Sequence, residues 1–271
     1  MRPADIDNAA VLRVLEPIWT DVTVTADRVR TRIEQILDWC THRKHRTGDN
    51  PARWKGNLKH ELSRVSKIHT VEHHPALPYK QIGEFFVQLH SRDGIAAMAL
   101  EFTILTAART GETIGARWNE IDWDEQAWTV PANRIKGGMP HRVPLVPRAI
   151  EILKACHRED DNPYVFIGLR DRGSGLSKMA MAHLLGRMGH DDITVHGFRG
   201  TFRTWAGDKT MHQREVIEKA LAHKVGDETE RAYDLGELFE KRRALMNEWS
   251  SYCLSPPRDA AKVIPMMQGR P

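Results

Sequence analysis

Cysteine is scarce in this chain, and the few cysteines form no recognisable pattern. The 271 residues include three of them, Cys40, Cys156 and Cys253, which lie far apart and have no paired spacing with histidine. A small disulfide-stabilised protein or a zinc finger would need cysteines at short, paired spacings. The sequence therefore predicts a reducing compartment and no bound metal ion.

Long apolar runs are also missing. The most apolar segment, residues 95–108, contains Glu101 and is shorter than the roughly 20 residues that span a bilayer. Residues 1–7 have neither the apolar stretch nor the small-residue cleavage site of a secretion signal. We therefore expect a cytoplasmic protein with no membrane partner.

Charge of one sign is only slightly in excess. The chain has 40 lysines and arginines against 36 aspartates and glutamates, a net charge of +4 and an isoelectric point near 9.0. This balance permits a polyanionic partner without identifying one. Hydrophobic residues make up 41% of the chain, enough for the core of one large domain or two modest ones.

Three amphipathic patterns predict a small all-helical unit near the N-terminus. Apolar residues recur at helical spacing over residues 25–39 and over residues 11–19, where Pro17 should interrupt the helix. A third and more basic pattern covers residues 55–66. We expect three short helices that pack through their apolar faces.

A stretch with two prolines separates this unit from the rest of the chain. Residues 71–78 read as a linker, because proline discourages helix in the residue before it. His73 and His74 lie in this stretch without a cysteine or carboxylate at ligand spacing, so we interpret them as solvated linker residues. We expect one domain over residues 1–80 and a second over residues 81–271.

The second domain opens with two predicted helices. Residues 81–91 form the first, and the nearly all-apolar residues 95–108 form the second, which should be buried and ended by Gly111. The last turn of this second helix should carry Arg109 to the edge of the core.

A small antiparallel sheet is predicted next. Its three short strands cover residues 120–123, 127–130 and 141–145. A turn at Gly137 and Gly138 places Lys136 at the tip or shoulder of the hairpin between the last two strands. Helical patterns return from residue 149, so the predicted fold is mainly α with a small antiparallel sheet.

Arginine and histidine residues dispersed along the second domain have the chemistry to act on a phosphodiester. Arginine keeps its charge and presents a planar fork of donors that binds two phosphate oxygens at once, which suits Arg109 and Arg199. His196 lies three residues before Arg199, so a helix would place both on one face. By itself, Arg109 is equally consistent with a helix-end arginine paired with Glu112, and Glu112 is also suited to supporting a phosphate clamp.

Tyr233 follows these residues in the chain and carries a phenol oxygen, which can act as a nucleophile once it is activated. Tyrosine has an ordinary pKa of about 10, so it attacks poorly at neutral pH until a base or a nearby positive charge helps to remove its proton. His223, ten residues earlier, and His196 both have suitable chemistry, and both stay candidates for the base. An isolated tyrosine is far more often structural, so its neighbours decide the interpretation.

The order and neighbourhoods of these residues resemble those of the tyrosine recombinases, specifically the P4-type branch of phage and genomic-island integrases. The matching blocks are Leu105–Glu112, Lys136–Leu145, His196–Trp205 and Ala220–Tyr233. The resemblance implies an all-helical core-binding domain joined to a mixed α+β catalytic domain with a small antiparallel sheet. It also implies six catalytic residues, namely Arg109, Lys136, His196, Arg199, His223 and Tyr233.

The resemblance also implies a reaction and its partners. Tyr233 would attack a DNA phosphate and form a 3′-phosphotyrosyl link, which conserves the energy of the phosphodiester bond, so no cofactor is needed. Lys136 would protonate the leaving 5′ oxygen. The implied partners are double-stranded DNA attachment sites of a mobile element, a homotetramer on DNA, and an excisionase or DNA-bending protein, all in the bacterial cytoplasm. Further candidates for DNA contact are Lys55, Lys59, Arg64 and Arg203.

Two features depart from the family pattern. Ala222 replaces the glycine that many recombinases have before the last histidine, and its small side chain predicts no loss of activity. From the resemblance we also expect the sequence to begin inside or just ahead of the core-binding domain and to lack the N-terminal arm-binding domain that is usual in this branch. The alternatives are therefore a truncated remnant that binds DNA without recombining it and a type IB topoisomerase-like enzyme.

Overall fold

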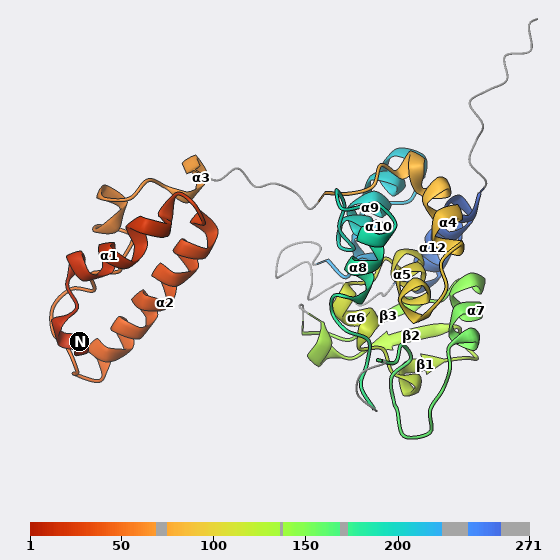
Figure 1. Ribbon diagram of the computed structural model, residues 1–271, viewed down its shortest axis with the longest axis horizontal. Helices are drawn as coiled ribbons and strands as arrows, with labels where there is room; N and C mark the ends of the chain where they lie inside the picture. The colour runs from red at the N-terminus through yellow and green to blue at the C-terminus, as the bar shows by residue number, and fades with distance from the viewer. Residues whose placement is uncertain (69–74, 136–137, 169–172, 224–237, 256–271) are drawn as a thin grey trace, which may run out of the picture. The chain divides into compact units, whose positions relative to one another are not determined.

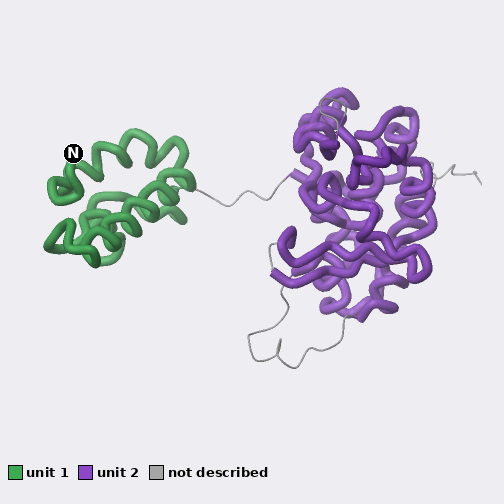
Figure 2. Tube along the Cα trace, turned by 90° about the horizontal axis from the view of Figure 1, so that it is seen from below, with its two compact units in different colours: residues 1–73 green, residues 74–271 purple. Residues whose placement is uncertain are grey.

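The chain forms two compact units, residues 1–73 and residues 74–271 (Figure 2). The computed structural model describes residues 1–68, 75–135, 138–168, 173–223 and 238–255. Each unit has its own cluster of buried hydrophobic residues. No helix in these described ranges is both long and apolar enough to cross a membrane.

The first unit is built from helices (Figure 1). Its elements are α1 (Asn8–Trp19), α2 (Thr23–His42), α3 (Val65–Ile68) and 3₁₀ turns at Pro3–Asp5 and Leu58–His60. The first two predicted helices are confirmed, but Pro17 does not interrupt α1. This proline is exposed, and it lies two residues before the end of the helix, so only a short stretch of helix follows it.

The third predicted helix, over residues 55–66, is wrong as a continuous element. The indole Nε1 of Trp19 donates to the carbonyl of Ser63 at 2.9 Å. A continuing helix would give that carbonyl to the amide of Lys67, which instead bonds to the carbonyl of Arg64 at 2.9 Å. The predicted helix is already broken before this point, because Gly56 has a φ of 91° and Asn57 has φ of −133° and ψ of −93°, which lie outside the helical region.

In the second unit, several helices surround a buried central helix, α5 (Ile95–Thr106), which lies next to a small sheet (Figure 1). The sheet is antiparallel in the order β1-β2-β3, with Ile121 opposite Trp128 and Trp128 opposite Val143. The predicted strands and fold class are confirmed.

The helices are α4 (Ile82–His90), α5 (Ile95–Thr106), α6 (Thr110–Ile114), α7 (Pro147–Ala155), α8 (Ala180–Arg187), α9 (Gly197–Lys209), α10 (Arg214–Ala220) and α12 (Phe239–Leu254). The strands are β1 (Ile121–Asp122), β2 (Ala127–Val130) and β3 (His141–Pro144), and 3₁₀ turns lie at Tyr79–Gln81, Trp118–Glu120 and Ala132–Arg134.

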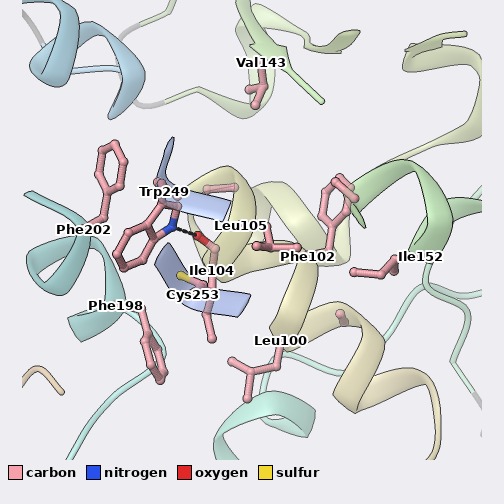
Figure 3. Packing of buried hydrophobic residues seen from close by; sticks show 14 of the residues in the cluster. Leu100, Phe102, Ile104, Leu105, Val143, Ile152, Phe198, Phe202, Trp249 and Cys253 are labelled. Carbon is pink, nitrogen blue, oxygen red and sulfur yellow. Dashed lines mark hydrogen bonds between the residues drawn. The ribbon is translucent and has the colours of Figure 1, made fainter. Parts of the chain in front are cut away.

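The core of the second unit gathers around α5, as its apolar sequence predicts. Figure 3 shows Trp249 of α12 donating its indole N–H to the carbonyl of Ile104 at 2.8 Å, which ties α12 to α5. The buried carboxylate of Glu101 is satisfied by two hydrogen bonds from Arg148, at 2.7 and 3.1 Å, and by one contact with His90 at 2.9 Å. The buried charge therefore joins α4, α5 and α7.

The end of α5 differs from the prediction. The helix stops at Thr106, because Ala107 adopts a left-handed conformation with φ of 50° and caps it. Gly111 lies inside the next helix, α6, and does not end α5. Arg109 consequently stands at the N-cap of α6, outside the last turn of α5.

Close packing at the start of α9 gives a stability prediction. A Cβ on Gly197 would lie 2.1 Å from the carbonyl oxygen of Pro75, whereas a Cβ on Gly207 of the same helix would meet nothing within 4 Å. We expect Gly197→Ala to lower the free energy of unfolding by about 1–3 kcal/mol, the usual cost of overpacking. Gly207→Ala should be neutral or stabilising, by up to about 1 kcal/mol. Urea unfolding of both variants tests this, and equal stability would contradict the close contact.

Candidate active site

Three of the expected residues converge on the carbonyl end of α10. The Leu221 carbonyl accepts hydrogen bonds from Nη2 of Arg199 at 2.5 Å and from Nη2 of Arg109 at 3.5 Å. Nη2 of Arg199 also lies 3.2 Å from Nε2 of His223. Residues from α6, α9 and the segment after α10 are thus held together, although Arg109 and Leu221 are 112 positions apart.

The end of α10 makes this convergence geometrically accessible. The helix closes at Leu221, and Ala222 follows with φ of 48°, a left-handed conformation that glycine adopts more easily. Nη2 of Arg109 reaches the Ala222 carbonyl at 3.4 Å, as well as the Leu221 carbonyl. The two guanidiniums therefore meet at the carbonyls of this turn.

Arg109 is held by Glu112. One carboxylate oxygen of Glu112 accepts from the backbone amide of Arg109 at 2.8 Å, and the other accepts from its Nη1 at 2.7 Å. The Glu112 side chain is 4% exposed, so this ion pair is shielded from solvent on one side. The sequence allowed Arg109 to be a helix-end arginine paired with Glu112 or a phosphate clamp that Glu112 supports. The two interpretations are compatible, because Arg109 stands at the start of α6 and Glu112 orients its guanidinium.

Arg199 is a buried cation. Its Nη1 donates to the Ala107 carbonyl and its Nη2 to the Leu221 carbonyl, and within the described ranges no carboxylate forms an ion pair with it. Burial, followed by the nearby charge of Arg109, lowers the pKa of Arg199 to about 10. The group still carries its charge at neutral pH. A buried guanidinium without an ionic partner creates a place that favours an anion.

His223 lies in a chain of polar contacts. Its Nδ1 is 2.6 Å from Oε2 of Glu218, and Oε1 of Glu218 accepts from Arg203 at 2.8 Å. Burial by itself raises the pKa of Glu218, but the hydrogen bonds from His223 and Arg203 outweigh it and hold that pKa below its usual value. Arg203, expected to contact DNA, has a half-exposed side chain that pairs with Glu218.

The other predicted site residues are placed differently. His196 stands at the N-cap of α9 with an exposed side chain, so it does not share the burial of Arg199. Lys136 and Tyr233 lie outside the described residues, as do His73 and His74 of the predicted linker. The remaining candidates for DNA contact are exposed residues of the first unit, namely Lys55, Lys59 and Arg64.

The segments on either side of Lys136 are anchored to the site. Before it, Nη1 of Arg134 donates to the Glu112 carbonyl at 3.3 Å. After it, the Arg142 carbonyl accepts from Nη1 of the buried Arg242 at 2.6 Å. Arg134 and Arg142 are therefore tied to α6 and to α12, respectively.

His141 is a site residue that sequence reasoning missed. It begins β3, hydrogen bonds to the backbone of Ala220, and lies close enough to Arg109, Glu112 and Arg242 to feel their charges. Burial, then the charge of Arg242, lowers the pKa of His141 to about 4. His141 lies within the Lys136–Leu145 block that resembles the family, and this position could have marked it as a site residue. From the sequence, His141 was assigned only to a strand.

The lowered pKa of His141 predicts a specific dependence of stability on pH. Between its ordinary pKa of 6.5 and the folded value of about 4, the unfolded chain binds a proton that the folded chain does not. Stability should therefore fall as pH drops through this window. This contribution should not change with pH above the window, and below it the loss should be complete. We expect His141→Gln to lose stability less steeply in urea unfolding at decreasing pH. The exposed His183→Gln is the control, and a His141 variant as steep as the wild type would contradict the buried neutral state.

The arrangement is suited to a phosphate and offers no metal site. Within the ranges that the structure describes, no group of three or more histidine, cysteine or acidic residues is arranged to hold a metal ion, and the three cysteines are free and buried. Two guanidiniums instead face one place from different helices, with an imidazole beside them. Such a set can bind two oxygens of a phosphodiester and stabilise the charge that develops during its cleavage.

Two family models match the chain. The phage integrase central domain matches residues 1–57, and the phage integrase family matches residues 78–235. The second match includes all six residues of the predicted catalytic set.

Known proteins are similar along most of the chain. The integrase of Enterobacteria phage P4 is 29% identical over 246 residues, covering 84% of this chain and 54% of that protein. The chain spans about half the length of the curated relatives it matches. A lambda integrase dimer bound to a core site has a TM-score of 0.60 at 16% identity and covers 82% of this chain and 80% of the other. A lambda integrase tetramer bound to a Holliday junction has the same TM-score and identity and covers 83% and 66%. The two lambda integrase structures therefore show that this chain shares their fold.

Proposed function

Because this chain belongs to the phage integrase family, as a P4-type tyrosine recombinase, we propose that it cleaves and rejoins DNA strands at specific sites. Each cleavage would leave a 3′-phosphotyrosyl link, and rejoining would integrate or excise a mobile element. The observation that carries the proposal is the buried, charged Arg199 beside Arg109, which favours an anion at this place.

The reaction assigns a task to each group. Arg109 and Arg199 bind the non-bridging oxygens of the scissile phosphate, and their charge stabilises the pentacoordinate state. The Tyr233 oxygen attacks phosphorus as its proton passes to a base, and the bond to the 5′ oxygen breaks. That oxygen takes a proton from Lys136. His196 stands at the start of the helix that carries Arg199 and is a further donor to the phosphate.

The proposal includes the partners of the reaction. Paired double-stranded DNA attachment sites are the substrate, and four copies of the chain assemble on them. The tetramer of lambda integrase on a Holliday junction supports this assembly. An excisionase or a DNA-bending protein sets the direction of the reaction, and the setting is the bacterial cytoplasm. Residues 1–80 serve as the core-binding domain, and residues 81–271 serve as the catalytic domain.

Trapping with a suicide substrate tests the proposed activity. A core site nicked next to the scissile phosphate loses its short leaving strand, so cleavage cannot reverse and covalent protein accumulates. Footprinting on the ends of the parent element supplies the site. A protein–DNA band that persists on a denaturing gel supports the proposed cleavage activity. A gel shift without any covalent band would instead identify a protein that binds DNA without cleaving it.

Lys136 is expected to act as the acid for the leaving oxygen. Lys136→Ala should cleave ordinary DNA slowly but should cleave a substrate with a bridging 5′-phosphorothiolate much faster, because sulfur leaves without needing a proton. Arg134 and Arg142, on either side of this residue in the sequence, bond to Glu112 and Arg242. The comparison of both substrates with wild type and variant measures the rescue, and equal slowing on both substrates would assign the proton to another donor.

A further inference from the structure

The chain of contacts from Arg203 through Glu218 to His223 determines which nitrogen of His223 faces the site. Nη2 of Arg199 lies 3.2 Å from Nε2 of His223, and Oε2 of Glu218 lies 2.6 Å from Nδ1. A guanidinium only donates hydrogen bonds and an ionised carboxylate only accepts them. Nε2 must therefore accept from Arg199, and Nδ1 must carry the hydrogen that it donates to Glu218.

We propose that Glu218 is a positioning residue that holds His223 in the Nδ1–H tautomer, so that Nε2 is left as the acceptor for Nη2 of Arg199. The inference rests on the proposed function and deepens it, because this contact holds the Arg199 guanidinium where the scissile phosphate is to bind. With the hydrogen on Nε2 instead, two donors would face each other and Arg199 would lose this support. Glu218 therefore acts on the reaction through His223 and Arg199.

Arg203 completes the arrangement. The Glu218 side chain is 12% exposed, and its Oε1 accepts from both Nε and Nη2 of Arg203, at 2.8 and 2.7 Å. Each carboxylate oxygen thus has its own donor, Arg203 on one and His223 on the other. The carboxylate stays ionised and cannot rotate without losing a contact, so the imidazole plane is fixed as well.

Glu218→Gln provides a test because an amide has one acceptor and one donor end. Arg203 must bond to the amide oxygen, which turns the NH₂ group toward Nδ1 and forces the hydrogen onto Nε2, against Arg199. We expect cleavage to slow by about 10²-fold, the upper scale for loss of an orienting partner. Glu218→Ala removes the contact without inverting it and should slow cleavage less, by about 10-fold.

Removal of Arg203 should reverse the effect of the amide. In Arg203→Ala with Glu218→Gln, the amide oxygen is free to turn toward Nδ1, so cleavage should recover most of the way to the rate of Arg203→Ala alone. A purely structural role of Glu218 predicts additive losses and no recovery. The matched control is Glu215→Gln, a half-exposed carboxylate on the same helix that pairs with Lys219.

The tautomer can be read without activity. Long-range ¹H–¹⁵N spectra of the full chain, with His223 identified by the signal missing from His223→Gln, should show the Nδ1–H form in the wild type and the Nε2–H form in Glu218→Gln. The double variant should return to Nδ1–H. An Nε2–H tautomer in the wild type, or no change with Glu218→Gln, would overturn the inference. Absence of covalent DNA from a wild type with the expected tautomer would instead reject the proposed recombination while leaving the positioning intact.

Discussion

Tyr233→Phe is expected to abolish covalent attachment to DNA while leaving site binding largely unchanged. The ring is retained and only the nucleophilic oxygen is lost, so contacts that depend on shape persist. Denaturing gels of the suicide substrate measure attachment, and native gel shifts measure binding. Loss of both together would assign the tyrosine to DNA binding instead of chemistry.

The matched control for this substitution is Tyr252→Phe. Tyr252 lies in α12 and packs against the rings of Trp205, Trp249 and Tyr79 in the second unit. Removal of its hydroxyl should leave covalent attachment close to the wild-type level. Persistent covalent complex in Tyr233→Phe, together with its loss in Tyr252→Phe, would move the nucleophile to α12.

Arg199→Ala is expected to slow cleavage by at least about 10²-fold, the scale for loss of one donor to a transition-state oxyanion. Arg199→Lys should recover only part of the rate, because an ammonium lacks the fork that reaches both the phosphate and the Leu221 carbonyl. Arg109→Ala should have a similar effect, since its guanidinium meets the same carbonyl. Single-turnover cleavage at saturating DNA separates this loss from weaker binding.

Folding must be checked for these variants because Arg199 is buried. Unfolding in urea should show that Arg199→Ala keeps a cooperative transition, since removal of a buried unpaired charge also removes its desolvation cost. The exposed Arg187, at the end of α8, supplies the control Arg187→Ala. Wild-type cleavage by Arg199→Lys would show that bidentate clamping is the wrong role for this residue.

Local sequence patterns predicted an element correctly where its contacts in the fold favour the same secondary structure. The apolar residues 95–108 made α5 a buried helix, and alternation with turn residues located the strands. The third N-terminal helix failed because the backbone leaves the helical region at Gly56 and Asn57. The Asn57 side chain bonds to Asn8 and to the Pro51 carbonyl, and the apolar spacing of residues 55–66 does not contain these contacts.

The candidate residues could be named from the sequence, but their contacts could not. Arg109 was assigned to the last turn of α5, because Ala107 gives no sign of the left-handed conformation that ends this helix. The contact of Arg203 with Glu218 and the position of His141 beside Arg109 were not predicted. These partners are brought near by the fold, and spacing along the chain does not contain that information.

The most direct test of the account is to identify the residue that becomes linked to DNA. The chain has four tyrosines, Tyr79, Tyr164, Tyr233 and Tyr252, so peptide mapping of the covalent complex from a suicide substrate distinguishes them. We predict that mass spectrometry will find the nucleotide on the peptide that contains Tyr233 and on no other. A nucleotide on Tyr79, Tyr164 or Tyr252, or a site-bound protein that never becomes covalent, would contradict the assignment of this chain as a tyrosine recombinase that cleaves through Tyr233.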